Sequence, residues 1–383
     1  MTIRSAVFGL FLLFAFLTPF IAPAYIVFAP LVALWVADAV RRRRWPAALS
    51  SWPAALAALL AALVTLSTIF SRDPTRSARH LGGISLLLLL PIAIDLLEDE
   101  KKGQTLVRAL GASGIVISIV GLWQFAHGGN DLGSRIRANL SHYMTFAGLT
   151  MLSGCVLLAL LFEEKGRRRL AGLAAFVPLT AMLLTFTRNA YVGTLVALIV
   201  YLAWRRPRGL LLLPAVLALL YVTLPAGIRD RVRSIADIQD PSNWDRLAMV
   251  DAGGRMIEDY PLTGVGPEMV KRYYVLYRRP DAVLWRVPHL HDNALQFAAA
   301  SGPLAGAAYL ALALLVIVQG ARRLSRERRP APAALLAGAF LASVALFAAG
   351  FFEYNFGDTE IEMATLLVWA VPFAPATAPR PSD

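Results

Sequence analysis

Charged residues are scarce in this chain of 383 residues: Asp, Glu, Lys and Arg make up 16% of it, whereas 57% of the residues are hydrophobic. A soluble domain needs more polar residues than this to cover its surface. The hydrophobic residues also come in long runs, and runs of about 18 or more are typical of membrane helices. The composition therefore excludes an ordinary soluble protein and predicts an all-α polytopic membrane protein.

Cysteine is nearly absent, and common nucleotide and nucleophile motifs are missing. The single cysteine, Cys155, lies in an apolar run, which excludes a disulfide framework and a thiolate metal site. Neither a GxxxxGK[ST] loop nor a GxSxG elbow occurs, which argues against nucleotide hydrolysis and a serine nucleophile of that type. The net charge of +12 could indicate nucleic-acid binding, but the basic residues fall in short clusters between apolar runs. We therefore expect membrane lipids, and no nucleic acid, as partners.

About twelve apolar segments predict transmembrane helices. Every second connection between them carries a basic cluster, and cytoplasmic loops are enriched in Lys and Arg. We therefore expect both termini to be cytoplasmic. The segments are residues 5–21, 24–40, 53–70, 82–97, 105–126, 143–162, 170–187, 190–204, 209–224, 293–319, 331–350 and 359–375, and the basic clusters are residues 41–44, 101–102, 165–169, 205–208 and 322–329.

The opposite side of the membrane then holds a long loop, residues 225–292, between the ninth and tenth predicted helices. It is too rich in charges and polar turns to be a span. Within it, residues 243–259 form a loosely amphipathic pattern, 261–267 read as a Pro- and Gly-rich turn, and 268–277 favour a second, tyrosine-rich helix. We predict a single transmembrane domain, residues 1–383, with this loop as a small helical periplasmic cap.

A polar stretch, residues 289–296, comes immediately before the tenth predicted helix and is where histidine, carboxylate and amide side chains crowd together. Asp292 is a good helix N-cap, so His291 should lie at the helix mouth. Histidine ordinarily titrates near neutrality, so His291 could accept a proton from a hydroxyl. In the alternative interpretation, Asp292 and Asn293 merely cap the helix and the histidines are interfacial. His289, His291 and Asp292 could ligate a metal, but no further ligand motif accompanies them, and we expect neither metal nor cofactor.

Arginines on the outer side form a second group, because positive charge is disfavoured there. Arg188 lies between two apolar runs, where an unpaired charge costs about 2.5 kcal/mol or more at mid-depth, so it should have a carboxylate or a bound anion as its partner. Arg246, Arg135 and Arg137 lie near other predicted helix mouths. Arginine binds phosphate through two hydrogen bonds at once, so these positions suggest a diphosphate.

Each arginine also has a simpler interpretation. Arg188 could extend to the interface, as long cationic side chains do at helix ends. Arg246 could be a solvated helix residue paired with Asp245 or Asp251, and Arg135 and Arg137 could be interfacial.

Several motifs together resemble bacterial O-antigen ligases, which share a membrane fold with O-antigen polymerases and pilin-type oligosaccharyltransferases. His291 and the Gly302–Ala305 turn have the spacing of the family's His and GxxG signature, although Asp292 replaces the usual amide and Ala305 the second glycine. Residues 257–267 are similar to the family's PLxGVGP turn, and residues 187–191 to its SRGAW hairpin. Residues 137–142 and 353–358 also fit.

The resemblance implies a glycosyltransferase that acts on the periplasmic side of a bacterial inner membrane without nucleotide or metal. Its donor would be a glycan on undecaprenyl diphosphate and its acceptor a sugar hydroxyl of lipid A-core. A polymerase using the same donor, and more distantly a transporter, remain alternatives. The implied catalytic residues are His291, which would deprotonate the acceptor, and Arg188 and Arg246, which would hold the diphosphate; Arg137, His142, His289, Asp292 and Asn293 are expected to bind substrate.

Overall fold

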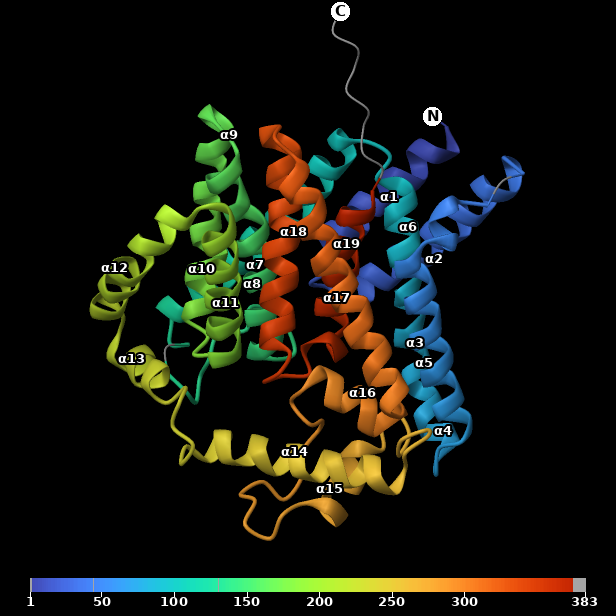
Figure 1. The fold of residues 1–383 in the computed structure, drawn as a ribbon, viewed down its shortest axis with the longest axis vertical. Coiled ribbons are helices and arrows are strands. Elements are labelled where there is room, and N and C mark those ends of the chain that lie inside the picture. Colours follow the sequence, from blue (N-terminus) through green and yellow to red (C-terminus); the bar gives the residue numbers. More distant parts are fainter. Residues whose placement is uncertain (1, 44, 130, 375–383) are drawn as a thin grey trace, which may run out of the picture.

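The protein is described by a computed structural model that covers residues 2–43, 45–129 and 131–374. These residues form helices joined by turns and loops, with no β-strand among them. Most helices run side by side as a bundle, and α14 and α15 lie across one end of it (Figure 1). The helices are α1 (Ile3–Leu17), α2 (Ile21–Arg41), α3 (Trp52–Ile69), α4 (Pro74–Ser77), α5 (Leu81–Ile84), α6 (Leu89–Leu96), α7 (Glu100–Ala126), α8 (Tyr143–Glu163), α9 (Gly166–Ala171), α10 (Phe176–Leu183), α11 (Arg188–Arg205), α12 (Pro207–Thr223), α13 (Ala226–Arg233), α14 (Pro241–Asp259), α15 (Val270–Tyr277), α16 (Asn293–Ser301), α17 (Pro303–Arg326), α18 (Pro330–Ala349) and α19 (Thr359–Ala370).

Within the described ranges, six helices are long and apolar enough to cross a membrane: α2, α3, α7, α8, α17 and α18. Shorter apolar helices, namely α1, α12 and the helical stretch Leu81–Leu96, coincide with further predicted segments. The prediction of an all-α protein with membrane-spanning helices is therefore confirmed. The full number of about twelve spans stays a prediction.

The centre of the bundle is formed by α8 and α18, which pack against each other. Both helices are apolar on nearly all sides and are largely buried, as expected for helices enclosed by others. α11 packs against α18 at Gly193, where a Cβ atom would lie 2.5 Å from the carbonyl oxygen of Ala345. This backbone approach explains the need for glycine. α11 is thereby fixed against the core, with Arg188 at its first turn.

One predicted segment is wrong in detail: residues 293–319 are not a single helix. The structure ends α16 at Ser301 and starts α17 at Pro303, with Gly302 between them at φ +90°. Only glycine adopts this conformation at low cost, and a Cβ atom here would lie 2.2 Å from the carbonyl oxygen of Leu262. Proline then suits the first turn of α17, where no N–H is needed. The break makes α16 a separate short helix that carries His291 at its entrance.

The helices predicted at 243–259 and 268–277 correspond to α14 and α15. The turn between them docks on the end of α16, because the backbone N–H groups of Val265 and Gly266 donate to the carbonyls of Ala299 and Ala300, each at 2.9 Å. A small apolar cluster, which includes Met249, Met256, Tyr274, Leu290 and Ala299, joins α14 and α15 to α16. The region is thus packed on the bundle; that it faces the periplasm stays a prediction.

The predicted orientation is tested by labelling two exposed positions, Gln239 and Ser325, with a membrane-impermeant thiol reagent. Gln239 lies just before α14, and Ser325 lies near the far end of α17, at the opposite end of the bundle (Figure 1). We expect Gln239→Cys to react in intact spheroplasts and Ser325→Cys to react only after lysis. Cys155 is buried and can be replaced by alanine to remove background. The reverse pattern would show that the orientation is inverted.

Candidate active site

His291 and Glu353 form the centre of the site. Nδ1 of His291 lies 2.8 Å from Oε2 of Glu353. Because a carboxylate only accepts hydrogen bonds, this contact places a proton on Nδ1 and leaves Nε2 of the neutral ring with a free lone pair. An imidazole held in this way can accept a proton at Nε2.

Glu353 is 4% exposed and stays charged. Burial alone would raise its pKa, but the hydrogen bond from His291, the charges that His291 and His289 carry when protonated, and the charge of Arg246 outweigh it, so the pKa lies below the ordinary value of 4.5. The stabilisation from this ion is therefore complete above pH 4.5 and is lost as the pH falls through the lowered value. A charged Glu353 also stabilises the imidazolium that forms when His291 takes up a proton.

His289 lies beside this pair, with Nε2 at 3.5 Å from Oε1 of Glu353 and its ring centroid 4.4 Å from that of His291. Burial lowers the pKa of His289 to about 4, so the ring is neutral at ordinary pH. His289, His291 and Glu353 each offer a ligand atom within 4.8 Å of the others, so these three side chains could hold a metal ion. Glu353, and not Asp292, is the third member of this group.

Asp292 and Asn293 position the neighbouring backbone. The Asp292 side chain caps α16 by accepting from the N–H of Leu295 at 2.8 Å, as its place in the sequence predicted. Asn293 is 1% exposed. Its amide donates to Tyr309 and Asn355 and accepts from the N–H of Phe356. These bonds tie α16 to the segment that carries Glu353.

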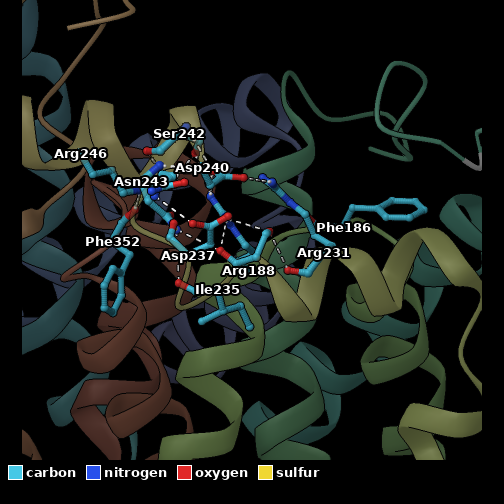
Figure 2. Close-up of polar contacts among 12 residues, drawn as sticks. Phe186, Arg188, Arg231, Ile235, Asp237, Asp240, Ser242, Asn243, Arg246 and Phe352 are labelled. Carbon is cyan, nitrogen blue, oxygen red and sulfur yellow. Dashed lines mark hydrogen bonds and ion pairs between the residues drawn. The ribbon is translucent and has the colours of Figure 1, made fainter. Parts of the chain in front are cut away.

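Arg188 belongs to a second polar network, drawn in Figure 2. Its side chain is 6% exposed, so it does not extend into solvent. One terminal nitrogen donates to the carbonyl and hydroxyl oxygens of Ser234 at 2.8 and 2.9 Å, and the other donates to Asp240 and Ser242, both at 3.0 Å. The partner that its position required is therefore a carboxylate from the loop before α14.

Arg246 and Arg231 lie at the edges of the same network (Figure 2). Arg246 donates from Nε to the carbonyl of Phe352 at 3.0 Å and from Nη1 to the hydroxyl of Ser242 at 2.8 Å. Arg231 donates to the carbonyl of Phe186 at 3.2 Å, and its Nη1 lies 3.8 Å from Asp240. In the described part of the chain, Nη2 of Arg246 has no hydrogen-bond partner. It can donate to a bound group.

The simpler interpretation of Arg246 is wrong. Asp245 is buried and accepts from the N–H groups of Val283 and Leu284, and Asp251 pairs with Arg255 at 2.9 Å. The contact of Arg246 with Phe352, the residue before Glu353, joins the arginine network to the His291–Glu353 pair.

Positive charge exceeds negative charge in the arginine network. Asp240 is in ion-pair distance of both Arg188 and Arg231. Burial, followed by the charges of Arg188 and Arg135, lowers the pKa of Arg231 to about 10 despite the opposing charge of Asp240. Burial likewise lowers the pKa of Arg246, with Glu353 opposing it and Arg188 adding to it. Such a cluster favours a bound anion.

Arg137 and His142 come from the segment between α7 and α8. Arg137 is exposed and donates to the carbonyl of Ser141 at 3.2 Å, and His142 caps α8 by accepting from Met144. Partial burial lowers the pKa of His142; Glu353 opposes this effect, whereas Arg135, His291 and Arg137 add to it. His142 thus lies at the start of α8, whose Thr145 donates to Asp358 in the loop that carries Glu353.

Backbone strain marks three of these segments. Phe186, His291 and Ala138 have φ values of 57°, 54° and 50°. Non-glycine residues in this region cost on the order of 1–3 kcal/mol and often cluster at functional sites. Phe186 lies two positions before Arg188, His291 is itself a candidate residue, and Ala138 follows Arg137. Backbone strain therefore coincides with the candidate residues.

The sequence did not identify Glu353 or Arg231 as site residues. Glu353 occurred in a matching motif, but its contact with His291 joins residues 62 positions apart and leaves no local signal. Arg231 is one of three arginines in α13, and only the fold distinguishes it from Arg229 and Arg233.

A protein-family model described as O-antigen ligase matches residues 173–310. This range contains Arg188, Arg231, Arg246, His289 and His291, whereas Glu353 and the 137–142 segment lie outside it. The match confirms the predicted resemblance over this part of the chain. A comparison with curated proteins finds no match.

Proposed function

We propose, with the O-antigen ligase match as the premise, that this protein transfers a glycan from undecaprenyl diphosphate to a sugar hydroxyl of lipid A-core. The reaction would take place on the periplasmic side of a bacterial inner membrane. The observation that carries the proposal is the His291–Glu353 pair, at 2.8 Å, joined through Phe352 and Arg246 to a cluster of arginines. A proton acceptor beside an anion site is what this transfer requires.

In the proposed step, the acceptor hydroxyl oxygen attacks the anomeric carbon of the donor sugar while its proton passes to Nε2 of His291. The bond between the anomeric carbon and the diphosphate oxygen breaks, and undecaprenyl diphosphate leaves with the electron pair. A single displacement inverts the anomeric configuration. Glu353 holds the ring by its Nδ1–H and stabilises the imidazolium.

The arginines would stabilise the charge that grows on the leaving diphosphate. Arg246 is best suited to contact it, because its Nη2 is free within the described residues and its other nitrogens are held by Phe352 and Ser242. Arg231 adds a second cation at the edge of the network. Arg188 adds a further positive charge to the network and holds Asp240 and Ser234 in place. Preorganised donors of this kind need no reorganisation during the reaction.

A reconstituted assay tests this function with two acceptors. Purified protein is given lipid-linked glycan with either lipid A-core or a second, differently labelled lipid-linked glycan, without nucleotide. We expect glycan transfer to lipid A-core. Elongation of the second lipid-linked glycan would instead identify a polymerase, and transfer to neither acceptor would contradict both enzyme assignments.

His291→Ala should lower the rate in this assay by about 10²- to 10⁴-fold, because general-base catalysis contributes that much. His289→Ala is the neighbouring control and should have a milder effect, since its neutral ring lies beside the pair and is not the proposed base. Chelator should leave the wild-type rate unchanged. Full activity of His291→Ala would exclude the base role, and sensitivity to chelator would indicate a metal held by His289, His291 and Glu353.

Arg246→Lys should lower the rate by about 10²-fold, the usual effect of losing one preorganised donor. Lysine keeps the charge but cannot reach Phe352, Ser242 and a ligand together. Arg255→Lys is the matched control on the same helix, because Arg255 is exposed and pairs only with Asp251 among the described residues. Equal rates for the two variants, at equal protein level, would remove Arg246 from the donor site.

A further inference from the structure

We infer that a cavity between the end of α7 and the start of α8 binds a saccharide that carries a negatively charged group. The cavity has a volume of about 610 Å³, within the range of small-molecule sites. Its identification with one of the two substrates rests on the proposed function. Its walls include Trp123, His127, Arg135, Arg137, Ser141 and His142.

An aromatic face forms one wall. Trp123 is 61% exposed, and its ring stacks against that of His127 with the centroids 4.5 Å apart. Nδ1 of His127 lies 2.8 Å from the carbonyl oxygen of Trp123, which fixes the imidazole against the indole. The C–H face of a pyranose ring packs well on a flat, exposed aromatic surface of this kind, while polar groups at the edge of the site bind the hydroxyls.

A second wall, formed by the loop that carries Arg135 and Arg137, is held in shape before any ligand arrives. The side-chain amide of Gln124 accepts from the N–H groups of Arg137 and Ala138 at 3.1 and 2.8 Å and donates to the carbonyl of Ala138 at 2.8 Å. These bonds fold the loop back onto α7. A preformed wall reduces the entropy lost on binding.

The charge of the cavity favours an acidic sugar or a sugar phosphate. Arg135 stacks over the ring of Tyr143 at 4.3 Å, and Arg137 is exposed with one nitrogen bonded to Ser141. Among the described residues that line the cavity there is no carboxylate. The nearby Asp131 accepts from the N–H groups of Gly133 and Ser134. Two guanidinium groups therefore face the ligand without a competing anion.

The cavity borders the candidate active site. His142 and Tyr143, at the start of α8, line it, and Thr145 in the same turn of α8 donates to Asp358 at 2.7 Å, in the loop that carries Glu353. A sugar chain held against Trp123 could therefore extend from the cavity toward the proposed base. The competing explanation is that Trp123 is only an anchor at the membrane interface, where tryptophan is common.

Binding is measured by saturation-transfer NMR on the full-length His291→Ala protein in detergent, so that no turnover is needed. The probes are the core oligosaccharide released from lipid A and the glycan released from its lipid carrier, each before and after its acidic groups are neutralised. We expect one acidic probe to bind and its neutralised form to bind about tenfold more weakly. The probe that binds distinguishes the acceptor from the donor.

Variants locate the binding. Trp123→Ala and Arg137→Gln should each weaken it about tenfold, corresponding to 1.4 kcal/mol, whereas Trp123→Phe should retain most of it. Trp285→Ala is the control, because Trp285 is similarly exposed, at 60%, but lies in a distant part of the sequence, under Arg278. If Trp123→Ala does not fold, Arg137→Gln and the neutralised probes still test whether the cavity binds the saccharide.

The inference is overturned if neither oligosaccharide binds, or if Trp123→Ala and Arg137→Gln bind as well as Trp285→Ala. Transfer in the reconstituted assay without such binding would leave the proposed enzyme intact and remove only the saccharide site. Binding without transfer would retain the saccharide site and contradict the proposed enzyme.

Discussion

A buried guanidinium imposes the main constraint on this end of the molecule. Arg188 lies at the start of α11, is 6% exposed, and needs partners because an unpaired charge there is costly. Of those partners, Ser234 and Asp240 lie between α13 and α14, and Ser242 lies in the first turn of α14. Neutralising one charge on a core helix therefore fixes where the chain returns and where α14 begins.

The position of α14 in turn determines how the arginine network meets the His291–Glu353 pair. Ser242 also accepts from Arg246, one turn along α14, and Arg246 donates to the carbonyl of Phe352. The next residue, Glu353, is held under His291, and Asn293 clamps the same segment to α16. A chain of hydrogen bonds thus runs from Arg188 to His291. We therefore expect that a substitution of Arg188 would shift the position of His291.

The sequence could predict those features of this arrangement that are set by residues close together in the chain. The cap at Asp292, the helices at α14 and α15 and the need of Arg188 for a partner follow from residues a few positions apart or from the adjoining apolar runs. The pairing of Glu353 with His291 is a product of the tertiary fold. The Gly302–Pro303 break had a local signal, but the uninterrupted hydrophobicity around it concealed the turn.

In the proposed reaction, the distribution of charge would separate two tasks that otherwise interfere. A proton acceptor is helped by a nearby anion, whereas a leaving diphosphate is helped by uncompensated cations. Glu353 is buried against His291 and His289, and Asp240 is engaged with Arg188 and Arg231, so neither carboxylate covers the free nitrogen of Arg246. Arg246 lies between the two groups and contacts the backbone next to Glu353 rather than the carboxylate itself. Its charge therefore remains available to a bound anion while Glu353 remains available to the histidine.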